Sequence, residues 1–196
     1  MFTVYGDKIS GNCLKVKYVA DLLGIEYQWI ETGVLSGETR NSEFLEINPA
    51  GQVPVLIGPE GRALAQSNAI MLYLAGGSAL IPADLWQKAK MNEWLFWEQY
   101  SHETAIAVAR FQVVYKGKTF AELAPELVVK GDAALNYMEG HLKAHEWFVG
   151  SAPSLADIAL FAYTQFAPDA GFDLECRPNI RRWLYQTASV LDLGSD

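Results

Sequence analysis

Basic residues, cysteines and long apolar runs are all scarce in this 196-residue chain. There are 15 Lys and Arg against 23 Asp and Glu, which gives a net charge of −8. The basic stripe that nucleic-acid-binding proteins use to neutralise phosphates is missing. The apolar stretch 69–75 is far shorter than the roughly 18 residues of a membrane span. We therefore expect neither a nucleic acid nor a membrane as partner.

The two cysteines, Cys13 and Cys176, are too few for a disulfide scaffold. The first ten residues also lack the basic and apolar segments of a secretory signal. Both features predict a reduced, cytoplasmic protein. With 51% hydrophobic and 19% charged residues, the chain has the composition of a globular protein rather than a disordered one.

Aromatic residues are plentiful and unevenly spread. They make up 12% of the chain. Seven of them crowd into residues 86–115: Trp86, Trp94, Phe96, Trp97, Tyr100, Phe111 and Tyr115. On a helix, one face of such a cluster packs a core, and another face can line a pocket or a dimer interface.

The first half of the chain alternates short strand and helix patterns. We expect strands over 2–5, 27–30, 53–57 and 62–65, and helices over 13–23, 42–47 and 67–74. Serines at 42 and 67 are expected to cap the second and third helices. The resulting order, β-α-β-α-β-β-α, is typical of a thioredoxin-like α/β domain with helices on the faces of the sheet.

The second half shows helical patterns only. Helices are expected over 84–115, 119–144, 154–166 and 179–191, with Asp84 capping the first and Pro125 near the start of the second. Ser154 and Asp157 form a variant of the capping box, which we interpret as a folding signal. We predict a thioredoxin-like domain over 1–76, a linker over 77–83 and an all-helical bundle domain over 84–196.

The first strand-to-helix junction reads Ser10-Gly11-Asn12-Cys13. Unpaired backbone N–H groups and the helix dipole favour an anion there, and lower the pKa of a thiol. A dithiol redox centre needs cysteine at both ends of this tetrapeptide, but Ser10 holds the first position. Its hydroxyl can instead donate a hydrogen bond to a thiolate supplied by a substrate. The alternative is that Ser10 simply caps the helix, which is the commoner role of such a serine when the residues are considered alone.

Two further junctions are candidates for ligand binding. If the Val53–Pro54 bond is cis, the backbone of Val53 is turned outward and can pair with a peptide-like ligand, although trans is the commoner form. Gln66 and Ser67 stand at the start of the helix over 67–74. A hydroxyl and free N–H groups at that position suit a carboxylate, and a simple cap is again the alternative.

Four segments, in this order along nearly the whole chain, resemble the cytosolic glutathione S-transferases of the bacterial, serine type: 5–16, 48–56, 66–74 and 150–163. The resemblance implies a detoxifying transferase that uses glutathione as co-substrate and acts on a small hydrophobic electrophile. It also implies a homodimer and a cis Val53–Pro54 bond.

The resemblance further implies roles for individual residues. Ser10 would stabilise the glutathione thiolate, and Asn12 could assist or replace it. Cys13 lies one helical turn later, where we expect it to pack beneath the helix.

The remaining glutathione contacts follow in the same way. Val53, beside Pro54, would pair with the cysteinyl backbone of glutathione. Gln66 and Ser67 would hold its γ-glutamyl carboxylate, and Gln52 is a candidate for its glycyl end.

The electrophile would lie against the long helix over 84–115. Tyr100, His102 and Arg110 are the candidates on this helix because each has a polar tip, although a lone histidine is more often structural. His141 and His145 are four residues apart, but no third ligand accompanies them. We predict a solvated face there and no metal.

Other classes of function remain open at this stage. A glutathione-dependent disulfide oxidoreductase or peroxidase would depend on Asn12 or Cys13. A non-catalytic relative that serves as an interaction module would bind glutathione weakly or not at all.

Overall fold

Four short strands form one mixed sheet in the first half of the protein, in the order β2-β1-β3-β4. The computed structural model describes residues 1–193. The strands are β1 (Phe2–Gly6), β2 (Tyr27–Glu31), β3 (Val55–Ile57) and β4 (Ala63–Ala65). β1 pairs parallel with β2 and antiparallel with β3, and β3 and β4 form a hairpin. The parallel pair needs a crossover connection, which α1 (Gly11–Leu22) supplies.

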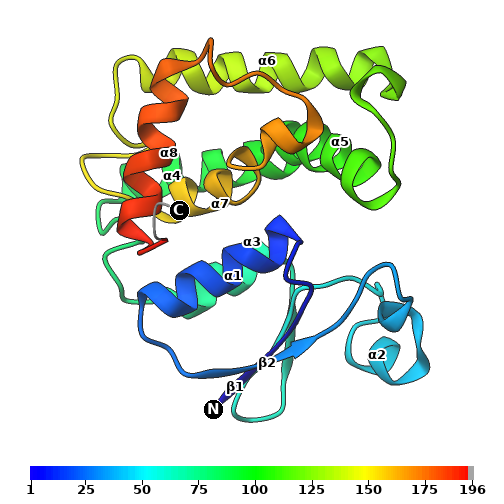
Figure 1. Cartoon of the computed structure of the whole chain (residues 1–196). Coiled ribbons are helices and arrows are strands. Elements are labelled where there is room, and N and C mark those ends of the chain that lie inside the picture. The colour runs from blue at the N-terminus through cyan, green and yellow to red at the C-terminus, as the bar shows by residue number, and fades with distance from the viewer. Residues whose placement is uncertain (194–196) are drawn as a thin grey trace. The chain divides into compact units, whose positions relative to one another are not determined.

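Helices cover this sheet as the sequence predicts. α1 and α3 (Ser67–Leu74) lie side by side in Figure 1. The short α2 (Ser42–Ile47) packs through Phe44, whose ring meets that of Tyr5 edge-on at 6.0 Å. Val4, which points to the other face of β1, is fully buried. The predicted thioredoxin-like order is therefore confirmed.

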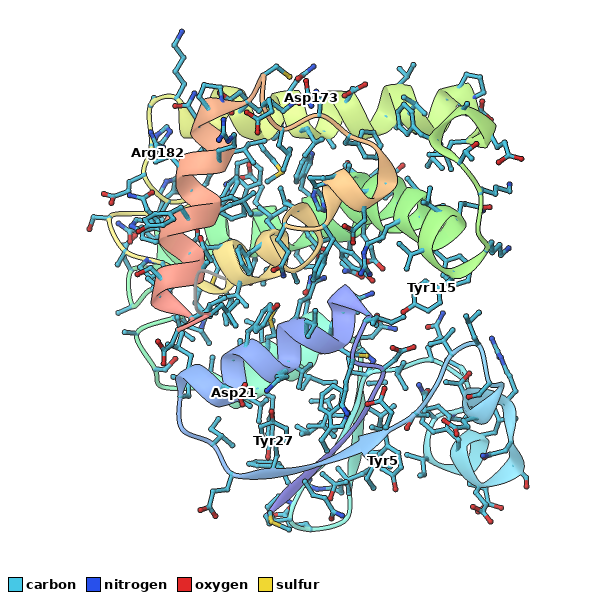
Figure 2. All side chains as sticks on the ribbon, viewed as in Figure 1. Tyr5, Asp21, Tyr27, Tyr115, Asp173 and Arg182 are labelled. Carbon is cyan, nitrogen blue, oxygen red and sulfur yellow. The ribbon has the colours of Figure 1, made fainter. Side chains whose placement is uncertain are left out.

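Apolar side chains of the sheet and of α1 and α3 fill the core of this half. The completely buried ones include Val4, Val16, Val19, Val55, Ile70 and Met71. At the C-terminal end of α1, Asp21 accepts hydrogen bonds from Lys17 at 2.6 Å and from the hydroxyl of Tyr27 at 2.8 Å. The bond from Tyr27 ties α1 to the start of β2, and Figure 2 labels both Asp21 and Tyr27 there.

The second half is all helical among its described residues. Its α-helices are α4 (Leu85–Trp97), α5 (Val108–Arg110), α6 (Pro125–Leu142), α7 (Leu155–Thr164) and α8 (Pro178–Val190). The chain divides into two units, Met1–Ser78 and Ala79–Asp196. That boundary falls inside 77–83, the segment predicted as a linker.

The helix expected over 84–115 is continuous but changes its winding. α4 begins after Asp84, whose carboxylate accepts a hydrogen bond from the N–H of Gln87 at 2.9 Å. α4 then passes into a π-helical segment, Glu98–Ala107, and a second one, Phe111–Tyr115, follows α5. The cap at Asp84 is confirmed, whereas the change of winding was not foreseen.

One predicted helix start and two predicted helix caps are wrong. α6 begins at Pro125 rather than at residue 119, because the chain is extended at Leu123 and Ala124 and the residue before a proline avoids helical backbone. Asn41, not Ser42, caps α2, accepting a hydrogen bond from the N–H of Phe44 at 2.7 Å. Ser67 is the first residue of α3 rather than its cap.

α7 is the centre of the helical unit, and all ten of its residues are buried. Its capping box is confirmed: both the N–H and the hydroxyl of Ser154 donate to Asp157. The other carboxylate oxygen of Asp157 accepts from the N–H of Phe148 and the indole of Trp183, each at 3.0 Å. Asp157 therefore joins α7 to a loop and to α8.

Arg182 of α8 donates to the carbonyl oxygens of Leu142 at 2.7 Å and His145 at 2.9 Å. The first bond satisfies a carbonyl group at the end of α6 that has no helical partner, and the second joins α8 to the loop after α6. Figure 2 shows Arg182 on α8. Among residues 1–193, no helix combines the length and the apolar character needed to cross a membrane.

Candidate functional site

Ser10 stands at the N-cap position of α1 with an extended backbone, yet its side chain makes no capping hydrogen bond. The hydroxyl instead acts on the thiol of Cys13, whose pKa it lowers against the larger effect of burial. Ser10 therefore does not cap α1 through its side chain. Ser10 presents a hydroxyl at the positive end of the α1 dipole, where N–H groups favour an anion.

Cys13 is fully buried beneath α1. The N–H of Asp7 donates to its sulfur at 3.3 Å. Burial raises the pKa of the Cys13 thiol to about 11, so the sulfur is protonated at neutral pH. The expectation that Cys13 packs beneath the helix is confirmed. A buried, protonated thiol is unsuited to the disulfide chemistry considered above, because the thiolate is the reactive form.

The starts of α1 and α3 are joined by a hydrogen bond between side chains. The hydroxyl of Ser67 donates to Oδ1 of Asn12 at 3.0 Å. Ser67 is buried, whereas Gln66, just before it, is exposed and has a left-handed backbone with φ of 73°. Two helix N-termini, where the first N–H groups have no acceptor within their own helix, therefore lie within reach of one small ligand.

The Val53–Pro54 peptide bond, just before β3, is cis, as the family resemblance implies. The loop before it is ordered by Asn48, whose side chain donates to the carbonyl oxygen of Gln52 at 2.7 Å and accepts from the N–H of Ala50 at 3.2 Å. Sequence reasoning assigned no role to Asn48. The sequence indicated this role through the position of Asn48 directly before Pro-Ala-Gly, because asparagine side chains commonly hydrogen-bond to the backbone of a turn.

Comparison with known proteins places the chain in a family. Models of the glutathione S-transferase N-terminal and C-terminal domains match residues 9–76 and 99–189. The solved glutathione S-transferase of Xanthobacter autotrophicus is 40% identical, with a TM-score of 0.91 over 96% of this chain and 93% of that one. That of Pseudomonas fluorescens is 41% identical, with a TM-score of 0.91 over 96% and 94%. The chain belongs to the glutathione S-transferase family.

A curated relative, glutathione S-transferase D7 of Drosophila melanogaster, is 28% identical over 180 residues, which cover 89% of this chain and 79% of the relative. The predicted family and enzyme class, with glutathione as co-substrate, are confirmed. Within this transferase, Ser10 and Asn12 share one helix start. Gln66 and Ser67 share another, and the bond between Asn12 and Ser67 links the two.

The structure does not bring together the three residues predicted for the electrophile. His102 of this transferase is fully buried, with its Nε2 3.0 Å from the hydroxyl oxygen of Thr164. Arg110 is buried and paired with Asp169 at 3.2 Å. Tyr100 is 83% exposed on a groove of about 560 Å³ between the long helix and α6. Their part in substrate binding stays a prediction.

Proposed function

We propose that this transferase ionises the thiol of bound glutathione at the start of α1 and directs the thiolate at a hydrophobic electrophile. The observation that supports this most directly is the position of Ser10. Its hydroxyl lies at the positive end of a twelve-residue helix, makes no side-chain cap hydrogen bond, and acts on the neighbouring thiol of Cys13 in the direction that lowers its pKa. A second sulfur at this helix end would meet the same donor.

The chemistry then follows from charge. Free glutathione is mostly protonated at neutral pH, and both a hydrogen bond to sulfur and the helix dipole favour the thiolate. A lowering of its pKa by about two units corresponds to roughly 2.7 kcal/mol. The proton passes to solvent, the sulfur lone pair attacks an electrophilic carbon, and the leaving group departs with its bonding electrons. No covalent bond to the protein is formed.

The other parts of glutathione are assigned to the neighbouring junctions. Val53 would pair with the cysteinyl backbone, which its place beside the cis bond to Pro54 supports. Gln66 and Ser67, at the start of α3, would hold the γ-glutamyl carboxylate. Gln52 is exposed and would meet the glycyl end.

The electrophile and the oligomeric state are further parts of the proposal. The electrophile is small and hydrophobic, with Tyr100, His102 and Arg110 as candidate contacts. A homodimer is proposed because family members are usually dimeric, and because Phe96 and Tyr100 are large, apolar and 75% and 83% exposed. The cytoplasmic location likewise stays a proposal.

Two measurements test the proposed function. The first is retention on immobilised glutathione followed by conjugation of glutathione to an aryl halide, in which the protein should bind and catalyse. The second is a crystal structure with glutathione, which should place the ligand sulfur nearest the hydroxyl of Ser10. A protein that neither binds glutathione nor conjugates it would contradict the proposal and favour a non-catalytic module.

A further inference from the structure

Asn48 follows α2 directly and begins a short loop that its own polar groups hold together. The residue is only 7% exposed. Its backbone carbonyl accepts a hydrogen bond from the N–H of Gly51 at 2.9 Å, and its Oδ1 accepts from the N–H of Ala50 at 3.2 Å. Its Nδ2 donates to the carbonyl oxygen of Gln52 at 2.7 Å. Asn48 therefore bonds to the backbone of three of the residues that follow it.

The two bonds of the Asn48 side chain determine which arm of its amide carries the oxygen. A backbone N–H can only donate, so the arm that faces Ala50 is Oδ1. A backbone carbonyl can only accept, so the arm that faces Gln52 is the NH₂ group. Rotating the amide by half a turn would break both bonds at once, and the side chain therefore has one orientation.

The bond to Gln52 also orients the next N–H of the chain. The carbonyl of Gln52 and the N–H of Val53 belong to one planar peptide unit, and in a trans unit these two groups point in opposite directions. Because the carbonyl points toward Asn48, the N–H of Val53 points away from it. Within residues 1–193 this N–H donates no hydrogen bond, and Val53 is only partly buried. Val53 therefore offers a donor to an accepting group of a ligand.

We propose that Asn48 is a positioning residue, which holds the peptide unit between Gln52 and Val53 so that the N–H of Val53 meets the cysteinyl carbonyl of glutathione. This inference rests on the proposed function, because it takes from it the pairing of Val53 with the cysteinyl backbone. It adds that the donor is oriented before the ligand arrives. Such preorganisation reduces the ordering cost of binding, so Asn48 contributes to affinity through Val53 rather than through a contact of its own.

The first test measures Kd for glutathione by calorimetry, together with kcat and KM in conjugation to an aryl halide. Asn48→Ala should raise Kd and KM about three- to tenfold, the size expected for one lost hydrogen bond. At saturating glutathione, kcat should stay within about twofold, because this contact is equally strong in the ground and transition states. An unchanged Kd would overturn the proposal.

Asn41→Ala is the matched control for this test. Oδ1 of Asn41 accepts from the N–H of Phe44 at 2.7 Å, at the start of α2. The variant therefore also loses an asparagine bond to the backbone, with a similar cost in stability. It should leave Kd for glutathione unchanged. Equal rises of Kd in Asn41→Ala and Asn48→Ala would mean that any loosening of this region weakens binding, which would contradict a specific role of Asn48.

A second ligand determines whether Asn48 acts through the N–H of Val53. The probe is a glutathione analogue with an (E)-alkene in place of the peptide bond between cysteine and glycine, so that it has no cysteinyl carbonyl. The wild-type protein should bind glutathione about three- to tenfold more tightly than this analogue. In Asn48→Ala this preference should shrink, because the carbonyl has lost its oriented donor. A purely structural role would weaken both ligands by the same factor, and an unchanged preference would overturn the proposal.

Circular dichroism and thermal unfolding establish that each variant is folded. If Asn48→Ala does not fold, Asn48→Asp provides a second route, because it keeps an oxygen for Ala50 but cannot donate to Gln52. In about 0.5 M salt, which screens the added charge, Asn48→Asp should also raise Kd and reduce the preference for glutathione. Wild-type values of both would contradict the proposal.

The failure of this inference is distinguishable from the failure of the proposed function. If the wild-type protein does not bind glutathione, the proposed function fails as well. If it binds glutathione and prefers it to the alkene analogue, but the Asn48 variants keep the same Kd and the same preference, only the role of Asn48 is wrong.

Discussion

At the scale of single residues, the polar groups at the start of α1 have different burial and partners. Ser10 and Cys13 belong to the same first turns, yet only the hydroxyl is partly exposed. The sulfur of Cys13 is buried, with its pKa raised to about 11 by desolvation. This difference supports the proposed role of Ser10 as the donor to an incoming thiol, because the buried sulfur of Cys13 is not available as a nucleophile.

The first prediction concerns Ser10. Ser10→Ala should lower kcat with glutathione and an aryl halide about tenfold or more, because a hydrogen bond to a charged group contributes about 1.5–3 kcal/mol. It should also raise the pH at which bound glutathione ionises. Steady-state kinetics across pH measure both effects. Ser42→Ala, which removes another hydroxyl at a helix start, is the control and should change neither. An unchanged pH profile in Ser10→Ala would move the thiol contact to Asn12.

The second prediction concerns His141, which was expected on a solvated face. Its ring instead stacks on those of His145 at 4.3 Å and Phe148 at 5.3 Å and meets Trp94 edge-on at 4.9 Å. Burial, and then the nearby charges of His145 and Lys90, lower the pKa of His141.

A histidine with a lowered pKa in the folded state is more easily protonated after unfolding. The contribution of His141 to stability is therefore complete above pH 6.5, its ordinary pKa, and is lost as the pH falls through its lower folded value. Thermal unfolding between pH 7.5 and 5 should show a declining Tm. His141→Phe, which keeps an aromatic ring without a titrating group, should flatten this decline. An equally steep decline in that variant would exclude His141 as its cause.

At the scale of elements, the sequence predicts most accurately where helix and strand patterns are short and well bounded. α3 was predicted over its full range, and the boundaries of β1 and β2 differ by one residue. The start of α6 was wrong because Thr119 and Glu122 form a capping box of their own around a short 3₁₀ turn. That box resembles the beginning of a long helix until Pro125 starts α6 anew.

The third prediction compares two aspartates at helix starts. Asp157→Ala should lower the free energy of unfolding by about 2–4 kcal/mol, because it removes a buried acceptor and leaves several buried donors unpaired. Asp84→Ala removes an exposed cap and should cost only about 1 kcal/mol. Urea unfolding of both variants measures the difference. Equal losses would mean that Asp157 acts as a simple cap.

At the scale of the whole molecule, the sequence specified the proposed glutathione contacts more fully than the proposed electrophile contacts. The junctions at Ser10, Pro54 and Ser67 are local, because each role depends on a helix or strand start that nearby residues define. The electrophile side depends on which face of a long helix is buried. Packing decides this, and the polar tips of His102 and Arg110 turn out to be paired with Thr164 and Asp169.

The fourth prediction concerns the homodimer. Leu85, Phe96 and Tyr100 are 83%, 75% and 83% exposed. Phe96 and Tyr100 lie 11 and 15 residues after Leu85, which is about three and four helical turns, so the three residues share one side of the long helix. A second copy that covers this stripe doubles the mass of the particle from 21.7 kDa. Phe96→Glu combined with Tyr100→Glu should shift the mass toward 21.7 kDa in light scattering.

The control for this prediction is Tyr185→Glu, since Tyr185 is 72% exposed on a different helix, α8. It should leave the mass unchanged. Two chains of charge −8 repel one another, so salt should strengthen an association that depends on apolar contacts. A wild-type mass of one chain at micromolar concentration would contradict the dimer. Equal dissociation by Tyr185→Glu, or association weakened by salt, would show instead that the stripe of Leu85, Phe96 and Tyr100 is not the surface that holds the two copies together.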